Sequence, residues 1–415
     1  MTSLIKENHL KQVGMLGQPI WLDDIRRDLI TGGELRCLIE EDGLRGMTSN
    51  PAIFAKAITG SHDYDEDIRS MALDEKDSME IYEALSRCDV QSAAAEFRTV
   101  YDETNGKDGY VSLEVNPHLA YNTNGTITEA RRLWAALNRP NVFIKVPATT
   151  EGLQAIQQLI SEGININVTL LFGLPRYRQA AEAYIAGLEA RLAQGKAVKR
   201  VASVASFFVS RIDTLVDPLL EEIIAQGGDK TQLAKQVHGQ VAIASAKAAY
   251  QIYKETFGSN RFKRLADQGA GVQRLIWAST GTKNPEYSDV KYVEALIGAN
   301  TVDTIPVETF DAYRDHGEPK ARLEQDIKGA NRVLLRLSAL GINIEKVTQQ
   351  LEQEGVQKFN HPFDEMIEVL AKKCSQNLGR YALCNQHGFA ASFQANESRK
   401  VPKEKVVTGK SACIK

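Results

Sequence analysis

Eight short runs of apolar and β-branched residues recur along the chain, with longer stretches of helical spacing between them. This alternation is typical of folds in which parallel strands alternate with helices. Eight repeats of the pattern predict one α/β architecture, a (β/α)8 TIM barrel. The predicted strands span residues 18–25, 46–51, 110–115, 142–147, 165–172, 201–208, 273–279 and 299–306.

Segments outside this regular alternation predict two additions to the barrel. Residues 63–85 and 90–99 have helical patterns and form an extra helical insertion before the third strand. Residues 327–370 are charged and helical in pattern, with a break at Gly341, and are expected to pack on the barrel as closing helices. The other helical patterns span residues 127–137, 150–162, 175–193, 218–227, 229–257 and 289–297.

The character of the sequence changes at about Cys374. Residues 374–415 have weak periodicity and contain seven Lys and Arg residues against two Glu residues, a net charge of +5. We therefore expect a barrel domain over residues 1–373 and a flexible, basic C-terminal tail over residues 374–415. A basic docking segment is the alternative interpretation of the tail.

Bulk properties exclude several classes of function. The 50 Lys and Arg residues nearly balance the 53 Asp and Glu residues, so nothing indicates a nucleic-acid or acidic-membrane partner. No apolar run approaches the roughly 18 residues of a membrane span, and the first residues lack a signal peptide's apolar core. These features favour a cytoplasmic protein.

The five cysteines include no CxxC pair, so we expect reduced thiols and neither disulfides nor a metal site. The oligomeric state stays open, a homo-oligomer included.

Side chains along a strand alternate between two faces, and in a barrel one of these faces points inward. In the strand 142–147, Val142, Ile144 and Val146 share the face expected to contact helices, which leaves Lys145 inside. The same alternation places polar residues inside the other early strands, near the carboxyl ends where barrel enzymes build active sites. These residues are Asp23, Thr48, Asn50, Ser112, Glu114, Asn165, Asn167 and Thr169.

Each of these polar residues also has a structural explanation when it is taken alone. Lys145 and Glu114 could neutralise each other in the core, and Asp23 could cap a turn. The asparagines and the threonines could stabilise turns or satisfy backbone groups. Together, however, an inward lysine with two acids, two amides and a hydroxyl is typical of a reaction centre.

The residue types favour imine chemistry on a ketone. Only a neutral amine attacks a carbonyl carbon, and desolvation of a lysine favours its neutral form. The protonated imine accepts electrons, so a neighbouring C–C bond can break once a carboxylate takes the hydroxyl proton. A second carboxylate with a hydroxyl can hold the water of the carbinolamine steps, and asparagines can bind sugar hydroxyls.

Candidate phosphate-binding residues lie at the ends of the sixth and seventh predicted strands, where barrels often bind phosphate. Ser206 lies near the end of the sixth predicted strand, and Arg211 follows that strand. The run 279–283, which includes Ser279 and Lys283, lies at the end of the seventh predicted strand. The alternatives are that Arg211 forms a surface ion pair and that residues 279–283 are an ordinary polar loop.

Several stretches around these residues resemble transaldolases, and the similarity is greatest to the longer branch of that family. They are GMTSNPAIF (46–54), VSLEVNP (111–117), VFIKVPATTEG (142–152), INVTLLF (166–172) and SFFVSRID (206–213), and the resemblance covers most of residues 15–370. It implies a (β/α)8 barrel related to class I aldolases. It also implies the pentose phosphate pathway reaction, which moves a dihydroxyacetone unit from sedoheptulose 7-phosphate to glyceraldehyde 3-phosphate. The products are erythrose 4-phosphate and fructose 6-phosphate, and neither a metal nor an organic cofactor is required.

The resemblance assigns the catalytic roles to four residues. It places the Schiff-base lysine at Lys145. The acid/base aspartate falls on Asp23, since the neighbouring Asp24 has the outward parity. The pair that positions the catalytic water falls on Glu114 and Thr169.

The resemblance also assigns substrate contacts, with one departure from the family pattern. Arg211 matches a phosphate-binding arginine, and Ser279 matches a serine after the seventh strand. The second arginine of shorter transaldolases has no clear match, and Lys283 is the available cation, which offers a point charge instead of a bidentate fork. The remaining substrate-contacting positions fall on Asn50, Asn167 and Ser206.

Two other functions compete with sugar transfer. A fructose-6-phosphate aldolase uses the same imine but releases the three-carbon unit; such relatives are much shorter and usually lack the glutamate found here at Glu114. A non-catalytic barrel used for binding should have lost Lys145, Asp23 or Glu114, and the sequence keeps all three.

Overall fold

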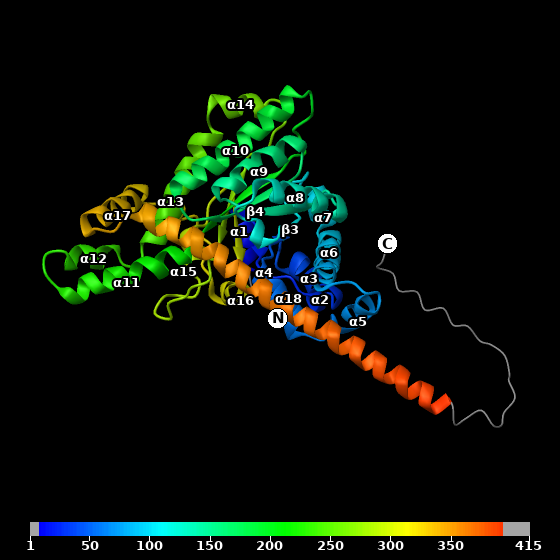
Figure 1. Ribbon diagram of the computed structural model, residues 1–415. Coiled ribbons are helices and arrows are strands. Elements are labelled where there is room, and N and C mark those ends of the chain that lie inside the picture. Colours follow the sequence, from blue (N-terminus) through cyan, green and yellow to red (C-terminus); the bar gives the residue numbers. More distant parts are fainter. Residues whose placement is uncertain (1–7, 393–415) are drawn as a thin grey trace, which may run out of the picture.

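The computed structural model describes residues 8–392, and its centre is a closed barrel of eight parallel strands (Figure 1). The strands follow one another around the barrel in chain order, and β1 pairs with β8 to close it. All eight predicted strands are present, so the predicted TIM barrel is confirmed. The strands are β1 (Ile20–Leu22), β2 (Gly46–Met47), β3 (Tyr110–Glu114), β4 (Val142–Pro147), β5 (Ile166–Leu171), β6 (Ser203–Phe208), β7 (Arg274–Ala278) and β8 (Thr301–Ile305).

Helices surround the barrel and connect its strands (Figure 1). Those up to β5 are α1 (His9–Met15), α2 (Arg27–Thr31), α3 (Glu34–Glu41), α4 (Pro51–Gly60), α5 (Asp65–Leu73), α6 (Ser78–Glu96), α7 (Arg98–Glu103), the 3-10 turn η1 (Pro117–Leu119), α8 (Thr123–Leu137) and α9 (Thr150–Glu162). Those after β5 are α10 (Leu174–Ala193), α11 (Ser210–Gln226), α12 (Thr231–Val237), α13 (Val241–Phe257), α14 (Asn260–Ala266), α15 (Lys291–Ala295), α16 (Val307–His316), α17 (Ile327–Leu340) and α18 (Ile344–Ser392).

The helical insertion before β3 is present, but its helices are divided differently from the prediction. α6 runs without a break through residues 86–89, and the break falls earlier, at residues 74–77. The Asp77 carboxylate accepts a hydrogen bond of 2.9 Å from the Glu80 backbone N–H, and the Glu80 carboxylate accepts one of 2.9 Å from the Asp77 N–H. This reciprocal capping box satisfies amide groups that the start of a helix leaves free, so it fixes where α6 begins.

α11 begins at Ser210, well before the predicted helix start at Pro218. Proline is tolerated best in the first turn of a helix, but Pro218 lies inside α11. Because proline has no backbone N–H group, the helix continues through this position with one hydrogen-bond donor missing. The earlier start matters for the site, because it places Arg211 in the first turn of α11, at the carboxyl end of β6.

Side chains inside the barrel confirm the predicted alternation. The rings of Tyr110 and Phe143 stack there with their centroids 4.2 Å apart. Since Phe143 points inward, Lys145 also points inward, two residues closer to the carboxyl end of β4. The strand register sets Glu114, Lys145 and Asn167 side by side on adjacent strands. The interior cluster consists of Trp21, Tyr101, Tyr110, Phe143, Val204, Ile276 and Val302, with the partly buried Ala202 against it.

The regular alternation ends near the carboxyl end of β5. The pairing with β6 shifts register between Val168 and Leu171, and Leu170 adopts a left-handed backbone with φ of 58°. A Cβ atom added to Gly355 of α18 would lie 3.0 Å from Leu170 Cδ2. The bulge therefore turns Leu170 toward α18, and the missing side chain at position 355 allows this close approach.

The long helix α18 packs across the carboxyl-terminal side of the barrel, against α4, α5, α6 and α11 (Figure 1). It is separated from α17 at Gly341, whose φ of 87° suits the residue that ends a helix, as the sequence predicted. α18 continues to Ser392, past the predicted boundary at residue 374, and residues 393–415 of the predicted tail lie outside the described residues. The division into domain and tail stays a prediction.

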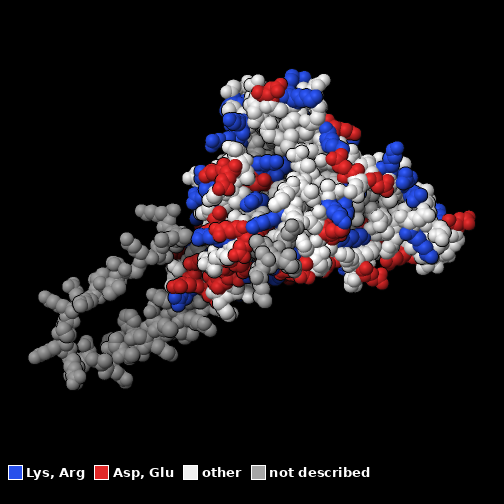
Figure 2. All heavy atoms as spheres, turned by 180° about the vertical axis from the view of Figure 1, so that it is seen from behind, with Lys and Arg blue, Asp and Glu red and all other residues white. Residues whose placement is uncertain are grey.

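The distribution of surface charge agrees with the near balance of basic and acidic residues in the sequence, and the helices agree with the absence of a long apolar run. Basic and acidic side chains are interspersed over the face seen in Figure 2. Within residues 8–392, no helix is both long and apolar enough to cross a membrane.

Candidate active site

Lys145 and Glu114 form a buried ion pair at the carboxyl end of the barrel. Lys145 is 4 % exposed and its Nζ lies 3.3 Å from Glu114 Oε2. The same ammonium group donates a hydrogen bond of 3.0 Å to the Ser49 carbonyl, and the Phe359 ring of α18 lies 5.4 Å away. Burial raises the pKa of Glu114 to about 7, although the charge of Lys145 opposes that shift. A carboxyl group of this kind can take up and release a proton near neutral pH.

Asp23 follows the last residue of β1 and faces the same site. Its carboxylate accepts a hydrogen bond of 2.7 Å from the Thr48 hydroxyl. Thr48 Oγ1 also lies 2.6 Å from Thr304 Oγ1, and since the Thr48 proton is used on Asp23, Thr304 is the donor in that contact. Burial raises the pKa of Asp23, opposed first by Lys145 and then by the hydrogen bond from Thr48. Asp24 instead contacts Arg26, at 3.2 Å, as its outward parity predicts.

Polar side chains on β3, β5 and β6 form a chain of hydrogen bonds beside the lysine. Asn167 donates from Nδ2 to Ser112 Oγ at 3.1 Å, and its Oδ1 accepts a hydrogen bond of 2.8 Å from Ser206. Thr169 lies on the same face as Asn167, and its buried hydroxyl has no hydrogen-bond partner among residues 8–392. The structure therefore fixes the orientation of Asn167 and leaves the Thr169 hydroxyl available.

A cavity of about 300 Å³ opens above Lys145. The structure brings seven of the ten predicted site residues to its wall: Asp23, Asn50, Lys145, Ser206, Arg211, Ser279 and Lys283. Glu114, Asn167 and Thr169 are not part of the wall, and the first two reach it through contacts with Lys145 and Ser206. Asn50 also caps α4, because its side chain accepts a hydrogen bond of 3.0 Å from the Ile53 N–H. Asn50 therefore has a structural role at the start of α4 and also lines the cavity, and its contact with substrate stays a prediction.

The cavity wall also contains residues that the sequence did not single out. Lys56 comes from α4, Lys358 and Phe359 come from α18, and Thr304 comes from the end of β8. Lys56 lies about one and two-thirds turns after Asn50 on a helix that starts at the barrel mouth, which is a signal that sequence reasoning can use. No local pattern marks Lys358 or Phe359, because α18 reaches the site only through tertiary packing.

Two cations of the cavity wall, Arg211 and Lys283, repel each other. Burial lowers the pKa of Arg211, although Asp23 and Glu354 favour its charge. Burial also lowers the pKa of Lys283, and the charge of Arg211 lowers it further. The Nε of Arg211 has no hydrogen-bond acceptor among residues 8–392. An anion between these two side chains would relieve their repulsion and accept their free donors.

The segments that carry these cations are tied to each other. Ser210 and Ser279 hydroxyls lie 3.1 Å apart, and the Ser210 N–H donates to the Ser279 carbonyl at 3.0 Å. Ser279 has a left-handed backbone with φ of 55°, so the chain turns sharply as it leaves β7. Further along the loop, Tyr287 donates a hydrogen bond of 2.8 Å to Asp217 of α11. The loop with Lys283 is therefore held against the helix with Arg211.

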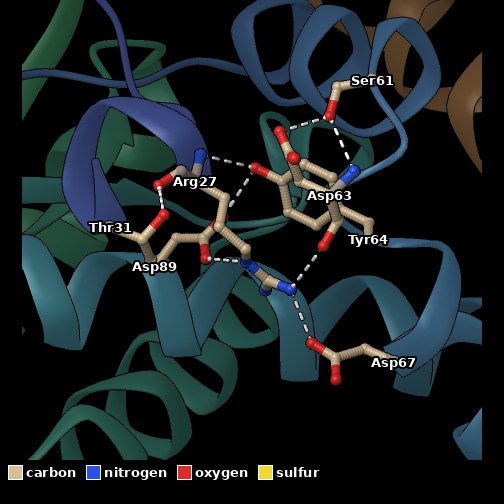
Figure 3. A network of polar contacts seen from close by, with 7 residues as sticks. All are labelled: Arg27, Thr31, Ser61, Asp63, Tyr64, Asp67 and Asp89. Carbon is tan, nitrogen blue, oxygen red and sulfur yellow. Dashed lines mark hydrogen bonds and ion pairs between the residues drawn. The ribbon is translucent and has the colours of Figure 1, made fainter.

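A buried polar network anchors the segment that follows Asp23 (Figure 3). Arg27 of α2 forms an ion pair of 3.0 Å with Asp89 of α6, and its guanidinium lies 4.3 Å from the centre of the Tyr64 ring. Tyr64 donates a hydrogen bond of 2.8 Å to Asp89 and accepts one of 3.1 Å from the Arg27 N–H. Arg27 also contacts the exposed Asp67 at 2.5 Å. The network joins the β1–α2 segment to the helical insertion.

Loss of the buried acid should destabilise the protein. We expect Asp89→Asn to lower the free energy of unfolding by about 3 kcal/mol, since it leaves the Arg27 charge without its buried partner. Asp67→Asn is the matched control, because this carboxylate binds the same arginine but is 51 % exposed, and we expect a loss below about 1 kcal/mol. Urea denaturation measures both values, and equal losses would contradict the importance of the buried pair.

Comparisons with known proteins agree with this geometry. The sequence model of the family described as Transaldolase/Fructose-6-phosphate aldolase matches residues 20–370. The transaldolase of Trichodesmium erythraeum is 50 % identical over 370 residues, which cover 88 % of this chain and 97 % of that protein. "Transaldolase 2" of Nostoc punctiforme is 45 % identical over 371 residues, with 88 % and 97 % covered. The transaldolase of Thiobacillus denitrificans is 44 % identical over 360 residues, with 87 % and 99 % covered. A match over most of both chains, on a barrel with a lysine and two acids at its mouth, shows that this chain belongs to the transaldolase family.

Proposed function

We propose that this protein is a transaldolase that transfers a dihydroxyacetone unit from sedoheptulose 7-phosphate to glyceraldehyde 3-phosphate, giving erythrose 4-phosphate and fructose 6-phosphate. The observation that supports this most directly is Lys145, a buried amine that is paired with Glu114 and lines a cavity together with the cations Arg211 and Lys283. We place the enzyme in the cytoplasm, because its proposed substrates are phosphorylated sugars. The reaction needs no cofactor because the imine itself accepts the electrons.

In the first half of the reaction, the neutral Lys145 amine attacks the ketone carbon of the donor sugar. Glu114, with a pKa of about 7, takes up or returns protons as the carbinolamine loses water and becomes an imine. The free Thr169 hydroxyl can hold that water together with Glu114. We assign the binding of the three-carbon unit's hydroxyl groups to Asn50, Asn167 and Ser206, since Asn50 and Ser206 line the cavity and Asn167 contacts Ser206.

Cleavage then depends on Asp23. Its carboxylate takes the proton of the hydroxyl next to the breaking C–C bond, the bond electrons move to the imine nitrogen, and the aldehyde product leaves. The enamine stays on Lys145 and attacks the acceptor aldehyde, while Asp23 returns the proton to the new hydroxyl. Water then adds to the new imine and the C–N bond breaks, which releases fructose 6-phosphate and frees the Lys145 amine. Arg211 and Lys283 bind the phosphate, and the exposed amine of Lys56 adds positive charge to the cavity wall. This set of cations offsets the absence of a second arginine after β7.

The central experiment is reductive trapping of the imine. With fructose 6-phosphate and borohydride, we expect a three-carbon adduct on Lys145, located by peptide mass spectrometry. An unmodified protein would contradict the proposal, and so would the same labelling of a Lys145→Met variant.

The family description also includes fructose-6-phosphate aldolase, so release of the three-carbon unit is the second candidate function. A transaldolase keeps the unit on the lysine until an acceptor arrives. With fructose 6-phosphate alone, we expect free dihydroxyacetone to form far more slowly than transfer proceeds with an acceptor. Release at the full transfer rate would favour the aldolase.

The pH dependence should report the ionisation of Glu114. Below a pH of about 7 this acid is protonated and cannot accept a proton, so kcat/KM should fall about tenfold per pH unit. In Glu114→Gln we expect kcat/KM to fall by at least about 100-fold, and the decrease of kcat/KM below pH 7 should disappear. Measurement of kcat/KM between pH 5 and 9 tests this, and an unchanged midpoint in the variant would assign the limb to another group.

A further inference from the structure

A second cavity lies at the amino-terminal end of the barrel, opposite the catalytic cavity. Its volume is about 660 Å³, within the range of pockets that bind small metabolites. The first residues of four strands form its inner part: Tyr110 of β3, Ser203 and Val204 of β6, and Arg274 of β7, with Phe143 of β4. The outer part consists of the segments 98–107, 199–202 and 269–272.

The charges around this cavity are unbalanced. Its wall contains five basic residues and a single acidic one, Asp102, which already pairs with Arg98 at 2.8 Å. Lys107, Lys199 and Arg200 are exposed at the opening, and none of them forms an ion pair within residues 8–392. Three uncompensated cations around one opening produce a positive potential that attracts anions.

Arg274 places a fifth cation in the inner part of the cavity. Its side chain is only 6 % exposed, and Nη2 donates to Asp108 at 2.8 Å and to the Lys107 carbonyl. Its other terminal nitrogen, Nη1, has no hydrogen-bond acceptor among the described residues. A buried guanidinium that keeps donors free is unusual, because buried polar groups are nearly always paired. The free donors suit a phosphate oxygen.

The wall opposite these charges is aromatic. Tyr110 stacks on Phe143, and the Tyr101 ring meets Tyr110 edge to face with centroids 5.4 Å apart. Above them, Trp21, Ile276 and Val302 complete the interior layer between this cavity and Lys145. The two cavities are therefore separate, and the imine chemistry does not use this one. In TIM barrels the amino-terminal face normally serves stability and not catalysis.

We infer that this amino-terminal cavity is a second anion-binding site, which takes a small phosphorylated metabolite. Lys107, Lys199 and Arg200 attract the phosphate group, Arg274 forms the charged inner wall, and Tyr101, Tyr110 and Phe143 contact the less polar part of the ligand. This site is independent of the transfer reaction, so it can exist whether or not the proposed function is correct.

The test measures binding of inorganic phosphate by equilibrium dialysis at low salt, where surface charges are least screened. The wild-type protein should bind phosphate at two sites, the catalytic cavity and the amino-terminal cavity. In the double variant Lys199→Glu/Arg200→Glu, affinity at one site should fall at least about tenfold, since two attractive charges become repulsive. Both residues are exposed, so the variant should fold normally.

Two further variants separate this site from general charge effects. Lys328→Glu/Lys346→Glu changes the net charge equally at exposed positions outside both cavities and should keep two phosphate sites. Arg211→Ala should weaken the catalytic site alone. Hydrogen exchange should show phosphate-dependent protection in segments 98–107 and 199–202. Equal binding by Lys199→Glu/Arg200→Glu and its charge-matched control, without such protection, would overturn the inference.

Discussion

Replacing Lys145 with methionine is expected to lower kcat/KM for sugar transfer on the order of 10⁶-fold, the size of loss typical when a covalent nucleophile is removed. Methionine nearly fills the volume of the lysine stem but cannot form an imine. No neighbouring amine replaces it, because Lys56 and Lys283 line the cavity wall without contacting Glu114. A coupled assay for fructose 6-phosphate formation measures the loss.

Stability measurements keep this result from being attributed to unfolding. The charge of Lys145 lowers the pKa of Glu114, so its removal raises that pKa further and leaves the acid neutral at pH 7. A neutral buried acid is tolerated, and we expect the melting temperature of Lys145→Met to match or exceed that of the wild type. Lys56→Met is the matched control in the same cavity, and it should mainly raise KM while imine trapping on Lys145 continues. A Lys145→Met enzyme with substantial activity would exclude the imine mechanism.

The sequence predicted the parts of the site that depend on strand periodicity. The alternation of β4 alone sets Lys145 inside the barrel, and the equal spacing on β3 and β5 sets Glu114 and Asn167 beside it. This prediction succeeds because a strand has only two faces. Once the apolar residues show which face contacts the helices, the residues between them must point to the opposite face, inside the barrel. The eight strands were found from a different signal, the short apolar and β-branched runs that alternate with helical patterns.

Features that depend on particular backbone or tertiary contacts were harder to predict. The capping box at Asp77 and the position of Pro218 inside α11 shifted helix ends, which short-range patterns define poorly. The bulge at Leu170 broke the period of two on which the alternation depends. Lys358 and Phe359 belong to a helix whose path over the barrel results from packing against α4, α5 and α6. Their positions follow from the assembled fold and not from their neighbours in sequence.

Replacing Asp23 with asparagine is expected to lower kcat about 100- to 10,000-fold, the range associated with loss of a general acid or base. Asparagine has the same shape, and its side-chain oxygen can still accept the hydrogen bond from Thr48. It cannot take the hydroxyl proton, so the step that fails is cleavage of the C–C bond. Imine formation, which uses Lys145 and Glu114, should continue.

The mass of the trapped adduct distinguishes this explanation from a general loss of activity. With fructose 6-phosphate and borohydride, the wild type should carry the three-carbon unit, whereas Asp23→Asn should carry the intact six-carbon sugar phosphate on Lys145. Asp24→Asn is the matched control, because Asp24 contacts Arg26 and is not part of the cavity wall. It should keep the wild-type rate and the three-carbon adduct. If Asp23→Asn accumulates the three-carbon adduct as fast as the wild type, another group must take the hydroxyl proton. Arg211 and Lys283 are cations and cannot act as that base while charged, so the next carboxylate to test would be Glu114, whose Oε2 lies 3.3 Å from Lys145 Nζ.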